Sequence, residues 1–482
     1  MRQSYAVNRA QDTDTHQTRE LSVYPHRQHA TTPDPAYHQD EERIEYGSLL
    51  PSPMTHSVVT RARSEESVRV PWLVFWIAFA VRVVYLTLAH TYRVRPYDDH
   101  MLFGEEMGRI ARALATGYGF ADPFRGHTGP TAWVGPLFPL LLGGIFKLFG
   151  VFSPLSAWVI LTFNSLFSAL TARTIWEIAA RCFSRCVAEW SAWIWALYPA
   201  AMQYAVRWFW DTSLTTLLFS WALVLALRLR ADGGLGRWAL FGLAWGLTGL
   251  SNPALLIFLP VCGLWVLAGA PARQASGVVL AAVLFTACLG VWTWRNWVAF
   301  HQLVPTRGNF GAELYLGNGP GSTGLLMEYD HPIQAPDQLR LYTRMGEIAY
   351  SRMRGDQAMA TMRADPLHFA ENSLKRVFFF WAGVPHPVSA TPWVEYARSL
   401  NFIFASVCGL LGLALALRRK VGAAGLFAWA FLLLPLVYYG VAAHARFRHP
   451  LEPLMVILGV YLFQSAELTK TVGKRKLKKL GI

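Results

Sequence analysis

Long runs of apolar residues alternate with short polar segments over most of the chain. The first run, PWLVFWIAFAVRVVYLTLAH at residues 71–90, is long enough to cross a bilayer as a helix. Further runs predict spans near residues 155–180, 187–206, 211–229, 238–250, 253–269, 276–294, 399–417, 424–441 and 451–466. The pattern therefore predicts an all-α fold, a polytopic membrane helical bundle of about ten spans.

One apolar run, VGPLFPLLLGGIFKLFG at residues 134–150, fits this pattern less well. It contains Pro136, Pro139 and the pair Gly143–Gly144, and it barely reaches the length that a span requires. We favour a helix that lies along the outer surface. A true span is the alternative.

The polar segments divide the chain into regions. Residues 1–66 have no apolar period and predict a disordered cytoplasmic tail. The regions that follow are an N-terminal transmembrane catalytic module at 67–294 with a first external loop at 91–154, an external loop at 295–398, C-terminal transmembrane helices at 399–467 and a basic cytoplasmic tail at 468–482.

Composition and charge support this organisation. The chain is 53% hydrophobic and 15% charged, whereas soluble domains carry about 25% charged residues. Its net charge of +14 comes mostly from basic residues beside apolar segments, as the positive-inside rule describes. Arg61, Arg63 and Arg69 therefore place the entry of the first span in the cytoplasm, and the basic tail suits anionic membrane lipid. No recognition motif accompanies the charge, so we expect no nucleic-acid partner.

The first external loop concentrates carboxylates just after the first span. Asp98 and Asp99 lie in RVRPYDDHMLFGEE, followed by Glu105 and Glu106. Carboxylates can take the proton of a hydroxyl group or bind a divalent metal, and the metal requirement is left open. The candidate catalytic residues are Asp99, Asp98 and Glu106. The alternative is that these acids only keep the loop solvated.

The sequence after these acids predicts an amphipathic helix on the bilayer surface. Met107, Ile110, Ala111 and Leu114 recur at helical spacing in FGEEMGRIARAL. If this helix extended back to Asp99, that residue and Glu106 would share one face.

Further polar residues occur at the outer ends of the spans. The candidate substrate-binding residues are His127, Arg207, Asp211, Arg295, Arg446, Arg448 and His449. Asp211 lies at the start of a predicted span, where an acid that faces lipid costs free energy. Its alternative role is to cap the N-terminus of that helix. The arginines of HARFRH suit a phosphate, and contact with lipid head groups is their alternative.

Two parts of the external loop carry local signals. The segment RGNFGAELYLGNGPGSTG at 307–324 is rich in glycine, as a phosphate-binding loop is, but it lacks the GK[ST] of such a loop. We therefore predict turns that shape a substrate cleft. Residues 349–381 have helical patterning and predict two surface helices.

Together these motifs resemble the C-type integral-membrane glycosyltransferases, the superfamily of protein O-mannosyltransferases and bacterial aminoarabinose transferases. The resemblance covers about 71–466 and includes TGPTAW, WRNW, ELYLGNGPGSTG and ARFRHPLEPL, which are similar to an uncharacterised bacterial branch. Residues 99–104, DHMLFG, look like the family's Asp-Glu-x-x-Phe-Gly, with His100 in place of the second acid. Counting back from Gly117–Phe120 instead aligns Glu106 with the acidic position of the family's first external loop. The assignment of the base therefore stays open between Asp99 and Glu106.

The resemblance implies a function. Such an enzyme transfers a hexosyl or pentosyl group from a polyprenyl-phosphate donor to a hydroxyl of a lipid, glycan or protein acceptor, with inversion. It implies a multi-pass protein of the bacterial inner (plasma) membrane with its active site on the periplasmic, external face of that membrane. One alternative is a flippase or transporter, but such proteins tend to contain internal repeats, and this sequence shows none. The other is an O-antigen polymerase-type protein.

Overall fold

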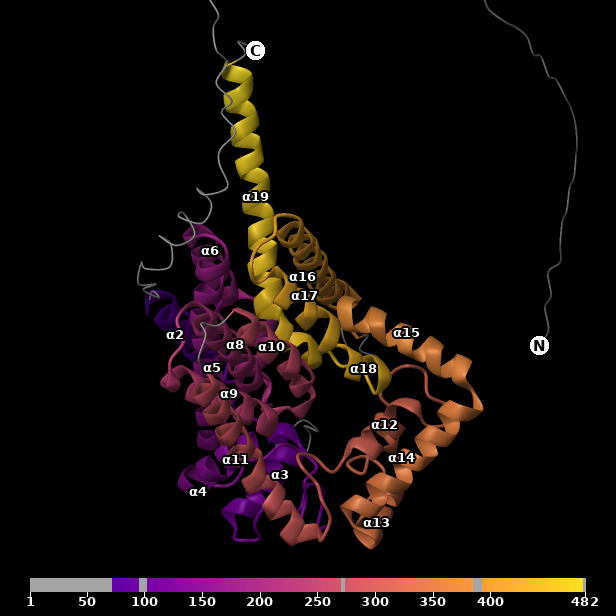
Figure 1. Ribbon diagram of the computed structural model, residues 1–482. Helices are drawn as coiled ribbons and strands as arrows, with labels where there is room; N and C mark the ends of the chain where they lie inside the picture. The colour runs from indigo at the N-terminus through magenta and orange to yellow at the C-terminus, as the bar shows by residue number, and fades with distance from the viewer. Residues whose placement is uncertain (1–71, 95–101, 270–273, 385–391, 480–482) are drawn as a thin grey trace, which may run out of the picture. The chain divides into compact units, whose positions relative to one another are not determined.

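The computed structural model describes residues 72–94, 102–269, 274–384 and 392–479 (Figure 1). All of them belong to one compact unit, Ser64–Ile482. Helices account for most of the described residues, and the part of the chain between these gaps contains no strand beyond one isolated bridge between Ala121 and Pro130. The all-helical prediction is therefore confirmed for the described residues.

The helices of the N-terminal half follow the predicted apolar runs. They are α2 (Trp72–Leu88), α3 (Glu106–Ala115), α4 (Leu137–Phe149), α5 (Pro154–Cys182), α6 (Arg185–Leu197), α7 (Pro199–Val206), α8 (Thr212–Ala231), α9 (Leu235–Ser251), α10 (Leu259–Gly269) and α11 (Ala275–Phe300), with short 3-10 segments η1 (Leu102–Gly104) and η2 (Pro253–Phe258). The later helices are α12 (Phe310–Asn318), α13 (Pro336–Met345), α14 (Glu347–Ala364), α15 (Pro366–Ala382), α16 (Pro392–Arg418), α17 (Ala424–Leu433), α18 (Leu436–Gly440) and α19 (Glu452–Lys479), with η3 (Glu328–Asp330) and η4 (Ala445–Leu451).

Within the described ranges, four helices are long and apolar enough to cross a membrane. They are α5, α8, α11 and the Glu395–Arg418 part of α16. Shorter apolar helices cover Trp72–Leu88, Leu137–Phe149, Pro253–Gly269 and Ala424–Gly440. The number of about ten spans stays a prediction.

Proline interrupts two of the predicted spans. The run at 187–206 is divided at Tyr198, which is extended, and Pro199 begins α7. The run at 424–441 is divided at Pro435 between α17 and α18. Proline has no N–H to donate and its ring crowds the preceding turn, so a continuous helix is broken at both positions.

The predicted loop at 295–398 is more helical than its glycines suggest. Residues 349–381 form parts of α14 and α15, as predicted. The prediction of turns at 307–324 was wrong in part, because residues 310–318 form α12. Buried Ala312, Leu314 and Leu316 support this helix, and Asn309 and Phe310 at its start line a pocket, as a cleft-shaping segment should.

The helix α3 is amphipathic, but protein covers its apolar face. Ile110 and Ala111 are 0% exposed, and α3 packs against α4. The helix begins at Glu106 and does not extend back toward Asp99 among the described residues. The prediction that its apolar face contacts the bilayer was therefore wrong, because α4 covers Ala111 and the buried residues of the first loop cover Ile110. At about 20 Å, α4 is shorter than the bilayer core, which favours the non-spanning interpretation.

A buried carboxylate fastens the first predicted loop, 91–154, to the predicted loop at 295–398. Glu347 of α14 accepts hydrogen bonds from the Thr131 hydroxyl, the Ala132 N–H (2.8 Å) and the Tyr342 hydroxyl (3.0 Å). Arg295 of α11 donates to the Thr131 carbonyl over 2.6 Å. The two loops, far apart in sequence, therefore lie at the same end of the bundle, where α3 and α12–α14 are found in Figure 1.

Candidate active site

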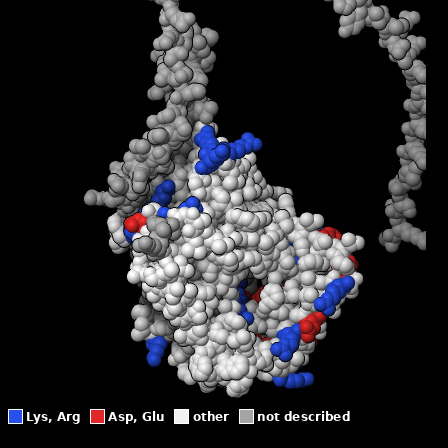
Figure 2. All heavy atoms as spheres, in the orientation of Figure 1, with Lys and Arg blue, Asp and Glu red and all other residues white. Residues whose placement is uncertain are grey.

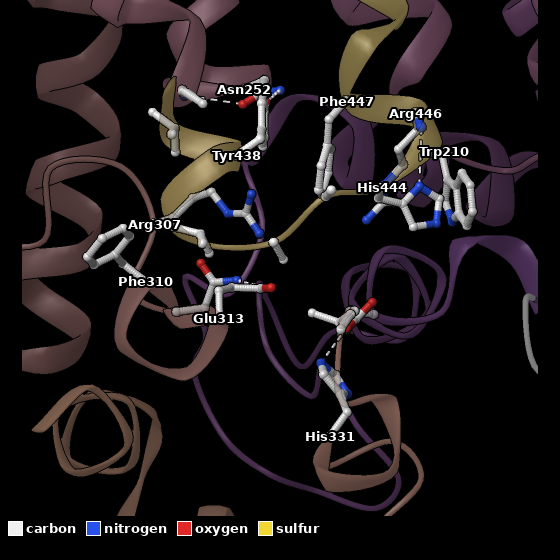
Figure 3. A pocket seen from close by; sticks show the side chains of 18 of the residues that line it. Trp210, Asn252, Arg307, Phe310, Glu313, His331, Tyr438, His444, Arg446 and Phe447 are labelled. Carbon is white, nitrogen blue, oxygen red and sulfur yellow. Dashed lines mark hydrogen bonds and ion pairs between the residues drawn. The ribbon is translucent and has the colours of Figure 1, made fainter. Parts of the chain in front are cut away.

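A cavity lies where these two loops meet the bundle. It encloses about 480 Å³ and is lined by the start of α3, η2, the region from Thr306 through α12, residues 326–334 and residues 437–447. Figure 3 shows that its polar side chains converge from these separate elements. We call this the outer pocket.

A smaller cavity of about 80 Å³ adjoins the outer pocket. Its lining adds the N-terminus of α8 and the end of α9. We call it the inner chamber. The residues that line both cavities are Glu106, Asn252, Arg307, Glu313, Arg446 and Phe447. These six residues mark the junction between the two cavities.

Backbone geometry at residues 103–105 brings the glutamates to the cavity. Phe103, Gly104 and Glu105 have consecutive positive φ angles of 48°, 78° and 53°, a conformation that is costly for residues other than glycine. Phe103 anchors this turn because its ring packs against Phe209 at 4.8 Å. A side chain at Gly104 would collide with the Phe209 carbonyl. The Phe-Gly of the motif therefore fixes where the following glutamates lie.

Glu106 lies beside a histidine of the predicted loop at 295–398. His331 Nε2 lies 3.4 Å from Glu106 Oε1. His331 Nδ1 accepts a hydrogen bond from the Ile333 N–H over 3.2 Å, so the proton of the neutral ring is on Nε2. His331 Nε2 therefore faces the Glu106 carboxylate at salt-bridge distance.

Arg446 contributes the positive charge on the other side of the outer pocket. Its guanidinium lies 4.3 Å from the centre of the Trp210 ring. His444, also in the lining, accepts the Arg446 N–H at Nδ1 over 3.2 Å. The neutral His444 ring therefore carries its proton on Nε2 as well.

Arg307 and Glu313 come from the segment around α12. Arg307 Nε donates to the Trp133 carbonyl over 3.0 Å, which fixes the side chain, and Figure 3 shows it between Tyr438 and Glu313. Glu313 Oε1 accepts from Asn309 Nδ2 over 2.9 Å. This segment thus brings an anchored cation and a carboxylate to the junction.

Glu105 is the acid whose ionisation is most altered. Burial raises the pKa of the Glu105 carboxyl to about 8, and the charge of Glu106 adds to this effect. The nearby guanidiniums of Arg446 and Arg109 act in the opposite direction. Glu105 is therefore mostly protonated at neutral pH and is suited to donate a hydrogen bond rather than to take a proton.

Asp211 occupies the N-cap position of α8, yet its side chain does not cap a backbone N–H. Asp211 Oδ2 accepts from the Thr215 hydroxyl over 3.3 Å, and Thr215 Oγ1 lies 2.7 Å from Ser251 Oγ. All three residues line the inner chamber. The carboxylate is thus directed toward a cavity rather than toward lipid.

Arg448 and His449 do not join the pocket. Arg448 is 0% exposed, pairs with Glu452 at 2.9 Å and donates to the Phe402 carbonyl over 3.0 Å. His449 Nδ1 also bonds to Glu452. Both side chains are therefore occupied inside the protein.

Three other candidates lie outside both linings. Arg295 donates to the carbonyls of Phe120 and Thr131 and thereby fastens the first loop. His127 is exposed and pairs with buried Asp122 at 3.0 Å. Arg207 is exposed at the end of α7. Asp98 and Asp99 lie outside the described residues.

Sequence reasoning missed several lining residues, among them Asn252, Arg307, Glu313, His331 and His444. Arg307 and Glu313 lie in the segment that was predicted to shape a cleft, so the segment was identified without its chemistry. Nothing in the sequence singled out His331, because its partner lies more than two hundred positions away.

No group of three His, Cys, Asp or Glu side chains within the described ranges is placed to hold a metal ion. The involvement of a divalent metal stays untested, since Asp98 and Asp99 lie outside these ranges.

No protein-family model matches the chain. No curated protein matches it either. Solved structures do. The Archaeoglobus fulgidus oligosaccharyltransferase in its apo form has a TM-score of 0.48 and 14% identity over 84% of this chain and 51% of that chain. The archaeal oligosaccharyltransferase AglB of the same organism, in complex with an inhibitory peptide and a dolichol-phosphate, has a TM-score of 0.44 and 14% identity over 85% of this chain and 52% of that chain.

ArnT from Cupriavidus metallidurans bound to undecaprenyl phosphate has a TM-score of 0.37 and 14% identity over 81% of this chain and 77% of that chain. The chain spans about half the length of the oligosaccharyltransferases, 51% in the apo form. These proteins are membrane glycosyltransferases of the superfamily whose motifs the sequence resembles.

Proposed function

We propose that the protein is a membrane glycosyltransferase that moves a sugar from a polyprenyl-phosphate donor to an acceptor hydroxyl on the outer face of the membrane. One observation carries this proposal. Carboxylates and guanidiniums from distant segments converge at the junction of two cavities, with Glu106, Arg307 and Arg446 lining both. Such a site can bind an anionic leaving group and deprotonate a hydroxyl in one place.

We assign the general base to Glu106 among the described acids. Its carboxylate takes the proton of the acceptor hydroxyl as the acceptor oxygen attacks the anomeric carbon. The bond from that carbon to the phosphate oxygen breaks, and the polyprenyl phosphate leaves with the electron pair. A single displacement of this kind inverts the anomeric carbon. Asp99, the residue that the motif favours, is the competing assignment.

Arg446 and Arg307 are proposed to hold the phosphate. Guanidiniums stay charged and bind phosphate oxygens in pairs, so they stabilise the negative charge that develops on the leaving group. Arg446 also lies over Trp210, which orients it. Arg448, with its closed set of partners, is not included in this role.

The surroundings of the outer pocket suit a lipid. Figure 2 shows a hollow in one face of the molecule with blue and red atoms at its wall, and white, uncharged surface around it. Val291, Trp294 and Val298 of α11 and Phe310 of α12 are all exposed. We propose that the isoprenoid chain of the donor leaves the pocket through this face.

The proposed topology has about ten spans, cytoplasmic termini and both loops outside a bacterial inner membrane. Reporter fusions near residue 330 should then be external, and fusions near residues 232 and 475 cytoplasmic. The contacts of Glu347 support one side for both loops, because buried hydrogen bonds do not form across a bilayer. A cytoplasmic signal near residue 330 would contradict the external site.

The direct test is release of sugar from a polyprenyl-phosphate donor by the purified protein in vesicles. Transfer to an acceptor with loss of glycosylated lipid supports the proposal. A flippase would move the intact donor across the bilayer without consuming it, and a polymerase would lengthen a lipid-linked glycan. Mass spectrometry of the lipid pool separates these three outcomes.

A further inference from the structure

Arg376 of α15 is a buried cation that lies outside the linings of both cavities. Its side chain is 0% exposed, and a buried charge is costly unless polar groups compensate it. Within the described residues its hydrogen-bond acceptors are carbonyl and amide oxygens. Arg376 Nη1 donates to Asn318 Oδ1 (3.0 Å) and to the carbonyls of Tyr439 and Gly440 (3.3 Å each), Nη2 to the Gly317 carbonyl, and Nε to the Gly324 carbonyl (3.3 Å). One guanidinium therefore joins segments that are far apart in the sequence.

Most of these acceptors belong to the C-terminal ends of two helices. The helix α12 ends at Asn318, and α18 ends at Gly440. The last carbonyls of a helix have no partner within the helix, and the partial negative charge at that end favours a cation. Arg376 thus compensates its charge with the ends of α12 and α18, and it holds these two ends together.

Close backbone contact brings the same two ends together without Arg376. A side chain at Gly317 would collide with the Val441 carbonyl, just past the end of α18. Asn318 Nδ2 donates to the Gly440 carbonyl over 2.9 Å. The joint between α12 and α18 therefore has little freedom to slide, and Arg376 of α15 bonds to both of its sides.

The two joined helices carry part of the lining of the outer pocket. Phe310 and Glu313 of α12 line it, and so does Tyr438 of α18. Arg307 lies just before α12, and Arg446 lies a few residues after α18, on different elements around the pocket (Figure 3). The relative position of the two arginines therefore depends on how α12 is fixed to α18.

We propose that Arg376 is a positioning residue that sets the spacing between Arg307 and Arg446, so that both guanidiniums bind one phosphate. This inference rests on the proposed function, which gives these two arginines the phosphate of the donor. Hydrogen bonds weaken steeply outside a narrow range of length and angle. Two guanidiniums on separate segments therefore bind the same phosphate only if those segments are held at a fixed distance.

The test measures the affinity of the purified full-length protein, in nanodiscs, for polyprenyl phosphate. Arg376→Met removes the guanidinium but keeps a long side chain. It should lower the affinity about tenfold, the size of one charge-assisted contact, because the phosphate then reaches only one of the two arginines. Arg376→Lys should recover only part of the affinity, because an ammonium lacks the planar fork that serves both helix ends.

The same change in an Arg307→Ala protein separates positioning from a general loss of structure. With one arginine absent, the spacing no longer matters, so Arg376→Met should cause little further loss of affinity. A loss by the same factor in both backgrounds overturns the positioning role. Unchanged affinity of Arg376→Met in the protein that retains Arg307 overturns it as well.

Arg82→Met is the matched control. Arg82 is also 0% exposed, and it donates to the carbonyls of Trp195 (3.2 Å) and Ala196 (2.8 Å) near the end of α6. It lines neither cavity. Its replacement should lower thermal stability, as Arg376→Met does, and leave the affinity for polyprenyl phosphate unchanged. An equal loss of affinity in the two variants overturns a specific role for Arg376.

A milder variant keeps the test available if Arg376→Met does not fold. Asn318→Ala removes one acceptor of Arg376 and the bond to the Gly440 carbonyl. It should lower the affinity about threefold, the size of a neutral hydrogen bond, and only in the protein that retains Arg307. No loss of affinity in Asn318→Ala, or the same loss without Arg307, overturns the inference.

Failure of the proposed function has a different signature. A wild type that does not bind polyprenyl phosphate overturns the donor assignment itself. The joint is then tested by the distance between spin labels at Phe310→Cys and Leu436→Cys, two exposed positions, in a protein without its native cysteines. Arg376→Met should shift or broaden the distribution of this distance. An unchanged distribution overturns the role of Arg376.

Discussion

Arg446 and Arg448 are two residues apart in the same short segment, yet they belong to two different charged regions. Arg448 is fully buried with Glu452, the carbonyls of Trp381 and Phe402, and His449 beside it. Arg446 lines both cavities and lies against Trp210. The first region is closed, and each charge has its partner within it.

The pocket region is open and unbalanced. The described residues that line the outer pocket include Glu105, Glu106, Glu313 and Glu328 but only two arginines, Arg307 and Arg446. Buried charges that are paired with one another stabilise the fold. Acids gathered around a cavity instead repel one another, so ionisation of each becomes less favourable. The difference indicates which charges are available to a ligand, and substitutions in the two regions should therefore fail in different ways.

The largest effect on turnover is expected from Glu106→Gln. General-base catalysis contributes roughly 10²–10⁴-fold in rate, so turnover should fall by about that factor while donor binding is kept, because the change is isosteric. Sugar transfer at saturating donor measures it. Asp99→Asn is the decisive comparison, and Asp98→Asn should be milder than either.

If Asp99→Asn loses activity by this factor and Glu106→Gln does not, the base is Asp99 and the Glu106 assignment is wrong. If both variants are inactive, their donor affinities distinguish the two roles. Loss of the base leaves donor affinity unchanged, whereas loss of a binding residue lowers it. Either result decides between the two alignments of the acidic motif that the sequence left open.

The closed region is expected to respond through stability. Arg448→Ala leaves Glu452 as a buried charge with only His449 beside it, and the loss of one partner of a buried pair costs about 3–5 kcal/mol. Thermal unfolding in detergent should show a large decrease in stability. The double variant Arg448→Ala/Glu452→Ala should recover part of the loss, because it removes the uncompensated charge. Stability equal to wild type in Arg448→Ala would contradict the structural role.

The sequence predicted the helical bundle well and the chemistry of the site only in part. Apolar runs and flanking charges define most helices, since length and hydrophobicity are local properties. Pro199 and Pro435 show the limit, because each divides an apolar run that composition alone treats as continuous. The position of α12 was missed because its glycines outweighed the buried Ala312, Leu314 and Leu316.

Site residues depend on tertiary neighbours, which a single sequence does not reveal. Glu106, Asp211 and Arg446 were identified from charge beside apolar runs and do line the cavities. The same signal also selected Arg448 and Arg295, whose charges are used within the protein. His331 carried no local signal, since only the fold brings it to Glu106.

Arg446→Ala should weaken donor binding while leaving stability nearly unchanged. Charge-assisted hydrogen bonds contribute roughly 1.5–3 kcal/mol, so a decrease in donor affinity of about tenfold or more is expected. Arg446→Lys should recover it only in part, because an ammonium cannot bind two phosphate oxygens in the same plane. Titration with polyprenyl phosphate measures this. Unchanged affinity in Arg446→Ala would leave this residue as a contact to lipid head groups.

His331→Ala is expected to reduce turnover about three- to tenfold, within the range of one hydrogen bond. The histidine Nε2–H orients the Glu106 carboxylate, so the effect should appear in kcat and not in donor affinity. His331→Gln, which retains an N–H donor, should recover part of the activity. A packing defect would instead lower stability in both variants alike, and that pattern in thermal unfolding would exclude a positioning role.

The smallest effect concerns Glu105 and depends on pH. The pKa of this carboxyl is raised to about 8 in the folded protein, so between about pH 4.5 and 8 the folded state binds more protons than the unfolded state. Stability attributable to Glu105 therefore falls as the pH rises through this window. Glu105→Gln cannot ionise and should be more stable than wild type at pH 8.5 by about 2–4 °C in apparent Tm, and close to wild type at pH 5.

Donor affinity should also fall as the pH rises, because a Glu105 carboxylate beside Arg446 competes with the phosphate for that guanidinium. Wild type should thus bind polyprenyl phosphate less tightly at pH 8.5 than at pH 6.5, and Glu105→Gln should show a smaller change. Identical pH profiles for the two proteins would mean that Glu105 is already ionised at neutral pH, and would place it with the solvated acids of the loop.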